Sequence, residues 1–332
     1  MPTARVTGDF PYEVVPDWHL GLARAGIRVH EFPDVAVDAA GRILLLAREP
    51  GMVVVVDSDG EVLSTFGEGV LSGRPHGISV GGDGVVYVVD QSTHQVQLFD
   101  SAGAHLGTIG SGEPSDTGVD LSLPVPGWTA SITRLGEPFN MPTSAATTAD
   151  GDLLVSDGYG NAALHRFDAD RRLVTSLGGP GLAPGRFMLP HYVIVARDGR
   201  IVVADREADR LQYFDASGAH LRDVTTVRRP TAVAERPDGL LVVGELAWQK
   251  GALAHRRGVL TRGSPARISV IRPDGRVVGR LAAAPGLAVQ GSVVAPHGLA
   301  LDAEGSLYVA EVSATFTRLT QPFTIQKFAA RW

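Results

Sequence analysis

One sequence scheme recurs six times along the chain and limits what it can fold into. The scheme reads xPxxxAVxxDGxLLVADxxxxxVxxFDxxGxxL, and its copies begin near Asp34, Pro75, Pro142, Pro190, Pro230 and Pro296. Short runs of Val, Ile, Leu and Tyr alternate with polar residues and end at Asp-Gly-type turns, which is the pattern of strands joined by hairpins. Each copy contains four such strands, here called a to d. Six units of four strands predict an all-β, six-bladed β-propeller.

We also expect the two ends of the chain to pair with each other in the last blade. The last unit stops after strand c, at TIQKFAARW (324–332), so we expect the segment YEVVPDW (12–18) to supply its fourth strand. This pairing closes the ring and removes exposed sheet edges. We expect a single domain over residues 1–332, because a cut anywhere would expose blade faces. A β-sandwich is the alternative, but a sandwich does not require a repeated unit.

Long insertions interrupt the repeat at three places: 111–139, 246–266 and 312–323. The first lies between blades 2 and 3, and the other two lie between strands b and c of blades 5 and 6. The bc loops and the links between blades emerge on one face of a propeller, whereas the ab and cd turns emerge on the other. Long loops gathered on one face of a rigid scaffold predict a binding face there.

Composition excludes several classes of function. The chain has no cysteine, which rules out disulfides and thiolate metal sites. Its net charge of −6 gives no reason to expect nucleic acid, and no apolar run is long enough for a membrane span or a signal peptide. The Arg-rich, Lys-poor composition is typical of a GC-rich genome. We expect a bacterial, cytoplasmic, monomeric protein that acts on a small molecule.

Histidine follows proline at the start of every second repeat. His76, His191 and His297 each lie eight residues before the glycine of their ab turn, in blades 2, 4 and 6. Thr143 and Thr231 hold this position in blades 3 and 5. Alternate blades of a closed ring would direct three imidazoles at the central axis, which predicts a His₃ metal site with an open position. The alternative is that Pro-His is only a preference for blade entry.

The seven other histidines show no such pattern, and we interpret them as surface or loop residues. They are His19, His30, His94, His105, His165, His220 and His255. His94 is the least certain of them, because it lies in a bc loop.

We expect zinc at the His₃ site, with iron or manganese as alternatives, since such sites serve several metals.

The ends of the b strands supply further candidates. Arg48 and Arg206 share one repeat position, and Tyr159 falls one residue further on, within DGYGN. Near a metal, the arginines could hold a carboxylate or carbonyl of the substrate, and the tyrosine would have a lowered pKa and act as a general base. Salt bridges and turn packing are the structural alternatives. We interpret Asp90, Asp157 and Asp205, which recur where strand b ends, as turn caps.

These residues resemble a known family. DGYGN, the Pro-His blade entries, LLAR (45–48) and GRFMLPHYVIVARDGRIVVADREADRLQYFD (185–215) are similar to the NHL-repeat propellers of the peptidyl-α-hydroxyglycine α-amidating lyase type. The resemblance covers roughly residues 30–330. It implies a zinc ion bound by His76, His191 and His297, and a site completed by Tyr159, Arg48 and Arg206. It also implies the splitting of an α-hydroxyglycine amide into an amide and glyoxylate.

The chain departs from the family at several positions. The family's disulfides are absent, and Ala295 and Gly298 flank the third Pro-His where animal members have Met and Asp. That Asp helps to hold a structural calcium ion, so the resemblance does not extend to calcium here. Our first hypothesis is a zinc-dependent lyase acting on a small hydroxylated amide, in which the substrate differs from a peptide hormone. The alternatives are a metal-dependent hydrolase such as a lactonase, and a non-catalytic NHL propeller that binds a protein or ligand.

Overall fold

The computed structural model describes residues 5–124, 127–283, 289–318 and 323–332. Besides one short hairpin, these residues form six antiparallel sheets. Five of them contain a meander of four strands from one sequence repeat, and the sixth combines three strands of the last repeat with a strand from the N-terminal part of the chain. Contacts divide the chain into two compact units. Unit 1 comprises Met1–Ile78, Thr231–Ala247 and Ser264–Trp332, and unit 2 comprises Ser79–Pro230 and Trp248–Gly263. Each unit contains three of the six sheets, which we call blades.

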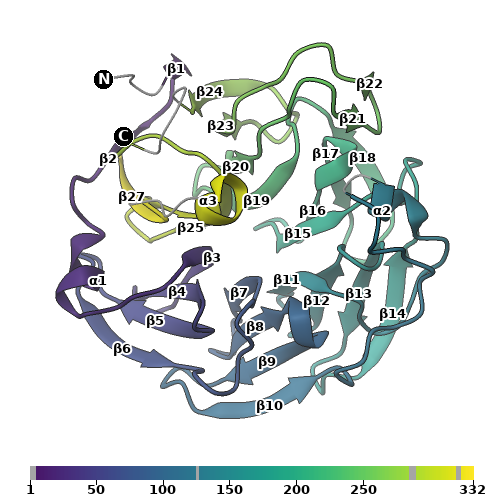
Figure 1. The fold of residues 1–332 in the computed structure, drawn as a ribbon. Coiled ribbons are helices and arrows are strands. Elements are labelled where there is room, and N and C mark those ends of the chain that lie inside the picture. Colours follow the sequence, from purple (N-terminus) through teal and green to yellow (C-terminus); the bar gives the residue numbers. More distant parts are fainter. Residues whose placement is uncertain (1–4, 125–126, 284–288, 319–322) are drawn as a thin grey trace. The chain divides into compact units, whose positions relative to one another are not determined.

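Unit 1 contains blades 1, 5 and 6 (Figure 1), although Pro230, the first strand residue of blade 5, belongs to unit 2. Blade 1 consists of β3 (Glu31–Val37), β4 (Ile43–Arg48), β5 (Met52–Val56) and β6 (Val62–Phe66). Blade 5 consists of β19 (Pro230–Glu235), β20 (Leu241–Glu245), β23 (Arg267–Ile271), β24 (Val277–Ala282) and the added strand β1 (Arg5–Gly8). Blade 6 consists of β25 (Pro296–Leu301), β26 (Leu307–Glu311), β27 (Ile325–Ala330) and β2 (Tyr12–Val14). Two short helices, α1 (Leu20–Arg24) and α3 (Ser313–Thr317), accompany them.

Unit 2 contains blades 2, 3 and 4, although Gly77 and Ile78 of the first strand belong to unit 1. Blade 2 consists of β7 (Gly77–Val80), β8 (Val86–Asp90), β9 (Gln95–Phe99) and β10 (His105–Ile109). Blade 3 consists of β11 (Pro142–Thr147), β12 (Leu153–Asp157), β13 (Ala163–Phe167) and β14 (Leu173–Gly178). Blade 4 consists of β15 (Pro190–Val195), β16 (Ile201–Asp205), β17 (Arg210–Phe214) and β18 (His220–Val224).

The predicted closure of the last blade is confirmed. Strand β2 pairs antiparallel with β27, with Tyr12 opposite Ala330 and Val14 opposite Phe328. Blade 6 also packs directly on blade 1, through contacts of β25 and β26 with β3. The first and last blades are therefore neighbours within unit 1. Strand β1 was not predicted, and it extends blade 5 to five strands by pairing with β24.

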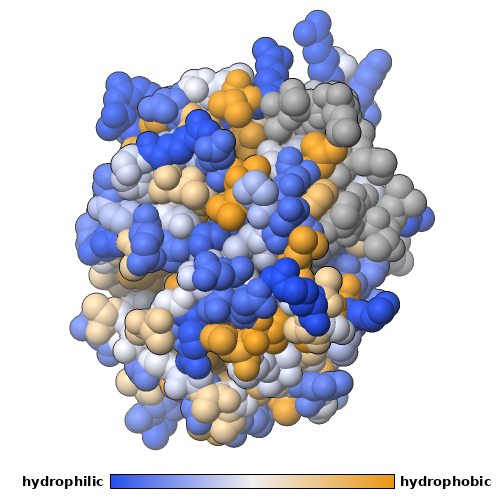
Figure 2. All heavy atoms as spheres, turned by 90° about the vertical axis from the view of Figure 1, so that its left-hand side faces the viewer, coloured by the Kyte–Doolittle hydropathy of each residue, from blue (hydrophilic) through white to orange (hydrophobic). Residues whose placement is uncertain are grey.

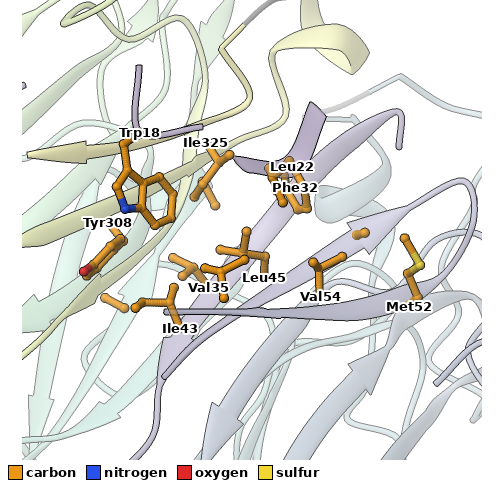
Figure 3. Close-up of a cluster of buried hydrophobic side chains, with 14 residues drawn as sticks. Trp18, Leu22, Phe32, Val35, Ile43, Leu45, Met52, Val54, Tyr308 and Ile325 are labelled. Carbon is orange, nitrogen blue, oxygen red and sulfur yellow. The ribbon is translucent and has the colours of Figure 1, made fainter. Parts of the chain in front are cut away.

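A buried apolar cluster joins blades 1 and 6 (Figure 3). Trp18 packs its indole on the ring of Tyr308, with centroids 5.3 Å apart, and Phe32 and Ile325 lie in the same cluster. Strand β4 is buried along its whole length. This burial explains why its sequence is a continuous apolar run that ends at Arg48. Burial of a side chain of this kind is worth about 1.5–3 kcal/mol, and the cluster therefore fixes the strand that presents Arg48.

The tight turns have the predicted backbone. Gly84 and Gly199 of the ab turns have φ angles of +79° and +83°, in the left-handed region that glycine adopts without strain. The carbonyl of Gly81 and the N–H of Gly84 close the first of these turns with a hydrogen bond of 2.9 Å. This conformation explains why the repeat places glycine at this position.

The insertions contribute short elements of their own. The insertion 111–139 contains α2 (Gly127–Ser131), 246–266 contains the hairpin β21 (Leu253–Ala254) and β22 (Gly258–Val259), and 312–323 contains α3. Residues 125–126 and 319–322 of these insertions lie outside the described residues. The single-domain organisation over residues 1–332 stays a prediction.

The surface is of mixed character. Figure 2 shows hydrophilic side chains over much of one face, with apolar side chains in several groups among them. Within the described ranges, no helix has the length and apolar composition needed to cross a bilayer.

Candidate functional site

In unit 1 the structure brings two of the predicted metal ligands together. The imidazole rings of His76 and His297 have centroids 4.7 Å apart, and both side chains are buried. Nδ1 of His297 lies 2.7 Å from the carbonyl oxygen of Pro33. A carbonyl oxygen only accepts hydrogen bonds, so Nδ1 carries the proton and Nε2 of the neutral ring keeps a lone pair. The hydrogen bond thus fixes the tautomer that a metal ligand needs.

Arg48 lies at the end of β4 beside the segment that carries His76. Its Nε donates to the carbonyl oxygen of Pro75 at 3.0 Å, and its Nη1 donates to Oε1 of Glu31 at 3.0 Å. Glu31 is fully buried and also accepts hydrogen bonds from the backbone N–H and the hydroxyl of Thr315 in α3. Arg48 is therefore a buried, paired cation that contacts the residue preceding a predicted ligand.

In unit 2 the structure brings three other predicted residues together. Oη of Tyr159 lies 3.2 Å from Nε2 of His191, and Nη1 of Arg206 donates to the same Oη at 2.9 Å. The guanidinium carbon of Arg206 is also 5.1 Å from the centre of the Tyr159 ring. The phenol oxygen thus lies between an imidazole nitrogen and a cation.

Acidic groups keep the charge on Arg206. Burial alone would lower the pKa of Arg206, but the neighbouring Tyr159 and Glu207 raise it overall. Glu207 accepts from Nε of Arg206 at 2.8 Å and from Nη2 of Arg229 at 2.8 Å. Burial opposes ionisation of Glu207, yet the two arginines hold the pKa of its carboxyl below its usual value. The sequence analysis did not single out Glu207, although it follows Arg206 directly.

Each acid at the end of a b strand caps the link that leads into the a strand of its own blade. Oδ1 of Asp205 accepts from the N–H groups of Met188 and Leu189, immediately before Pro190 and His191. Glu311 does the same for Val294 and Ala295, before Pro296 and His297. These hydrogen bonds agree with the interpretation of such acids as caps, and they show what is capped.

The threonines at the alternate blade entries have a structural role. Oγ1 of Thr143 donates to the carbonyl oxygen of Pro190 at 2.9 Å, and Oγ1 of Thr231 donates to that of Pro296 at 2.7 Å. Nδ1 of His297 makes a comparable hydrogen bond, to the carbonyl oxygen of Pro33. The architecture of blade entry thus accounts for Nδ1 of this imidazole.

All three insertions contact the candidate site within their own unit. Trp128 of α2 packs on Tyr159, with ring centroids 5.7 Å apart, and its indole N–H donates to the Tyr159 carbonyl oxygen. Trp248 donates to Oδ1 of Asp209, three residues after Arg206, at 2.9 Å. Thr315 contacts Glu31, as described above. Sequence reasoning located the insertions but could not identify these contacts.

One interpretation of the other histidines was wrong. His165 is neither a surface nor a loop residue: it lies on β13 and is fully buried. Its Nδ1 is 2.8 Å from Oγ of Ser176, and its Nε2 is 3.4 Å from Oδ2 of Asp157. Strand alternation does not reveal this burial, because both faces of a middle strand pack against neighbouring blades.

The residue that follows the third Pro-His is glycine for a steric reason. A Cβ atom on Gly298 would lie 2.4 Å from Cα of Asp34 and 3.0 Å from the Pro33 carbonyl oxygen. Blade 6 therefore approaches blade 1 too closely for any larger residue at this position.

The residues present fit a metal ion. His76, His191 and His297 are all buried, and three buried histidines could bind a metal. Neutral imidazole is the commonest metal ligand in proteins, and zinc, iron and copper all accept it.

Comparison with known proteins places the chain in context. Solved structures of a streptogramin B lyase (TM-score 0.56, 11% identity, 98% of each chain) and of virginiamycin B lyase from Staphylococcus aureus (TM-score 0.55, 11% identity, 99% of this chain and 89% of that one) share the fold. The chain is thus a six-bladed β-propeller, and the NHL repeat model matches residues 73–99.

Its relatives include proteins named as amidating lyases. A probable peptidyl-α-hydroxyglycine α-amidating lyase of Caenorhabditis elegans is 28% identical over 204 residues, which are 58% of this chain and 53% of that protein. Peptidylglycine α-amidating monooxygenase of Rattus norvegicus is 30% identical over 50% of this chain but only 16% of its own length. NHL repeat-containing protein 3 of Mus musculus is 27% identical over 84% of this chain and 76% of its own. The first two matches span about half and about a sixth of those relatives.

Proposed function

We propose that this protein is a metal-dependent lyase that splits a small α-hydroxyglycine amide into an amide and glyoxylate. One observation carries the proposal: Oη of Tyr159 lies 3.2 Å from Nε2 of His191 and 2.9 Å from Nη1 of Arg206. This arrangement puts a group able to accept a proton beside a candidate ligand atom and a fixed cation. The relatives named as amidating lyases support the same reaction type.

We further propose that His76, His191 and His297 hold one metal ion, zinc in the first instance and iron or manganese as alternatives. The occurrence of Pro-His in alternate blades supports this grouping, as does the tautomer of His297, whose Nε2 keeps its lone pair. A bound divalent ion would act as a Lewis acid on an oxygen of the substrate. Proton transfer and binding of the substrate carboxylate are the roles that we assign to side chains of the protein.

In the proposed reaction, Tyr159 first accepts a proton from the substrate and later returns it. As phenolate, Tyr159 takes the proton from the substrate hydroxyl, the carbon–oxygen double bond of glyoxylate forms, and the carbon–nitrogen bond breaks. The departing amide nitrogen then receives a proton from the phenol, which restores the phenolate. Arg206 assists because a positive charge 2.9 Å from Oη favours negative charge on that oxygen.

The arginines are suited to hold the substrate carboxylate. Arg206 uses Nε for Glu207 and Nη1 for Tyr159, and its Nη2 makes no hydrogen bond within the part of the chain that the structure describes. Arginine binds carboxylates through paired N–H groups. Glu31 and Glu207 keep Arg48 and Arg206 in place, so neither guanidinium has to be ordered when substrate binds.

Elemental analysis combined with a glyoxylate assay tests this function. The wild-type protein should contain about one metal ion per chain and release glyoxylate from α-hydroxyhippurate. A variant with His76→Ala, His191→Ala and His297→Ala should lose both properties while retaining its β-sheet circular dichroism. Metal binding with hydrolysis of a lactone instead would favour a hydrolase. Equal metal content in both proteins would contradict the proposal.

The expectations of a monomer, of a cytoplasmic location, and of neither nucleic acid nor membrane as partner stay predictions.

A further inference from the structure

A pocket lies beside the turn that carries Tyr159, and the mechanism above does not use it. Its volume is about 390 Å³, within the range of small-molecule sites. The bc loop of blade 2 contributes Gln91 and His94, and the first insertion contributes Val119 and Leu121. Met141, just before β11, lines it as well. The pocket lies within unit 2, as do Tyr159 and Arg206.

Met141 connects this pocket to the catalytic tyrosine. The backbone N–H of Met141 donates to Nδ1 of His94 at 3.0 Å, and its carbonyl oxygen accepts from the N–H of Tyr159 at 3.4 Å. Met141 has φ = +65°, so its backbone is held in the left-handed region by these contacts on both sides. His94 and Tyr159 are thus separated by a single residue of a third segment.

His94 offers the pocket a hydrogen-bond donor. Because Nδ1 accepts the Met141 N–H, the proton of the neutral ring is on Nε2. Burial lowers the pKa of His94, which favours this neutral form. Nε2 has no protein acceptor among the described residues. The lining combines apolar side chains with the polar side chains of Gln91, Ser92 and Asn140, and an N–H group among them can donate to a carbonyl oxygen of the ligand.

The part of the wall formed by the first insertion is apolar and partly open. Leu121 is 51% exposed although it lines a cavity, and it lies in the first insertion. Val119 packs against the core cluster of blades 3 and 4, which anchors this wall to the scaffold. An apolar side chain in the same pocket as a fixed donor could pack against an apolar group of a ligand whose carbonyl oxygen accepts from that donor.

We propose that this pocket binds the acyl group of an N-acyl-α-hydroxyglycine, with an unbranched apolar chain against Leu121 and the acyl carbonyl oxygen on Nε2–H of His94. The identity of the substrate rests on the proposed function, whereas the preference of the pocket for an apolar amide does not. The first insertion is then the element that sets substrate specificity.

Two variants test the two walls. Leu121→Trp fills the pocket, and Leu123→Trp, at a half-exposed neighbour that does not line it, is the matched control. His94→Asn keeps an acceptor for the Met141 N–H and tolerates the left-handed backbone of His94, at φ = +55°, but lacks the Nε2 donor. Circular dichroism and thermal unfolding establish that each variant is folded.

Turnover and binding are measured separately. Glyoxylate release is compared for N-hexanoyl- and N-acetyl-α-hydroxyglycine, and binding of the non-reacting product hexanamide is measured by calorimetry. Wild type should prefer the hexanoyl substrate about tenfold or more in kcat/KM, since buried methylenes add binding energy. Leu121→Trp should reduce that preference to about twofold and weaken hexanamide binding, and Leu123→Trp should do neither. His94→Asn should raise KM for both substrates by about two- to tenfold with kcat retained.

The outcomes separate this inference from the proposed function. Hexanamide binding that depends on Leu121 and His94, without glyoxylate release from either substrate, would retain the pocket and overturn the lyase. Glyoxylate release at equal kcat/KM for both substrates would overturn the pocket and retain the lyase. Hexanamide binding that is absent, or unchanged in Leu121→Trp, would also overturn the pocket.

Discussion

Nη1 of Arg206 donates a 2.9 Å hydrogen bond to the phenol oxygen of Tyr159, and that oxygen is 3.2 Å from Nε2 of His191. If Tyr159 transfers the proton, Tyr159→Phe should lower kcat by about 10²–10⁴-fold with little change in metal content. The measurement is glyoxylate release alongside elemental analysis. Tyr12→Phe, on β2 and outside the proposed site, is the control and should keep wild-type activity. Retention of kcat in Tyr159→Phe would assign the proton transfer to another group.

Glu207 compensates the charge of two arginines in the interior of unit 2, because Arg206 and Arg229 both donate to its Oε1. Glu207→Gln removes the buried negative charge and leaves two cations close together. We expect a loss of about 3 kcal/mol in the free energy of unfolding, as for other broken buried ion pairs, measured by urea denaturation. Glu113→Gln, at an exposed position, should change the stability by less than about 0.5 kcal/mol. Equal stabilities for the two variants would contradict the role assigned to Glu207.

Gly298 lies where blade 6 meets blade 1, and an added Cβ would be 2.4 Å from Cα of Asp34. The Cβ has a fixed position and meets backbone atoms of Asp34 and Pro33, so no side-chain rotation can relieve the contact. Gly298→Ala should lower the free energy of unfolding by at least about 2 kcal/mol. The control is Gly82→Ala, because nothing lies within 4 Å of a Cβ at that position. Thermal unfolding of both variants checks the prediction, and a stable Gly298→Ala protein would show that the two blades can move apart.

Glu311 should make stability depend on pH. Burial raises the pKa of its carboxyl from 4.5 to about 7 in the folded protein. Between these two values the carboxyl is ionised in the unfolded chain but protonated in the folded protein. The contribution of Glu311 to stability is therefore fully present below about pH 4.5 and is lost as the pH rises through about 7. The linked free energy is on the order of 3 kcal/mol.

The matched variant for this pH effect is Glu311→Gln, which retains an oxygen to accept the N–H groups of Val294 and Ala295. Urea unfolding at pH 5 and pH 8 should show a larger loss of stability for wild type than for the variant. Parallel losses in the two proteins would mean that Glu311 does not titrate in this range.

Much of the fold could be predicted from the repeat alone. The positions of the six a strands, the glycine turns and the pairing of Tyr12–Val14 with the last blade all follow from local patterns that recur with a fixed offset. Strand β1 could not be predicted, because all four residues of Arg5–Gly8 are exposed and show no alternation between buried and exposed positions. The strand forms by pairing with β24. His165 was misassigned because alternation fails in strands that are buried on both faces.

For the candidate site, the sequence by itself determined which residue types stand at equivalent positions: the three histidines after proline, the two arginines, and the tyrosine one residue further on. Only the tertiary structure decided what each of them touches. Glu31, Glu207, Trp128 and Met141 also reach the site, but the repeat scheme does not specify their residue types. Glu207 is adjacent in sequence to its partner Arg206, whereas the other three contact residues at least 17 positions away. The physical reason is that a periodic pattern encodes which side of a strand is buried, whereas hydrogen-bond partners depend on how separate strands and loops pack together.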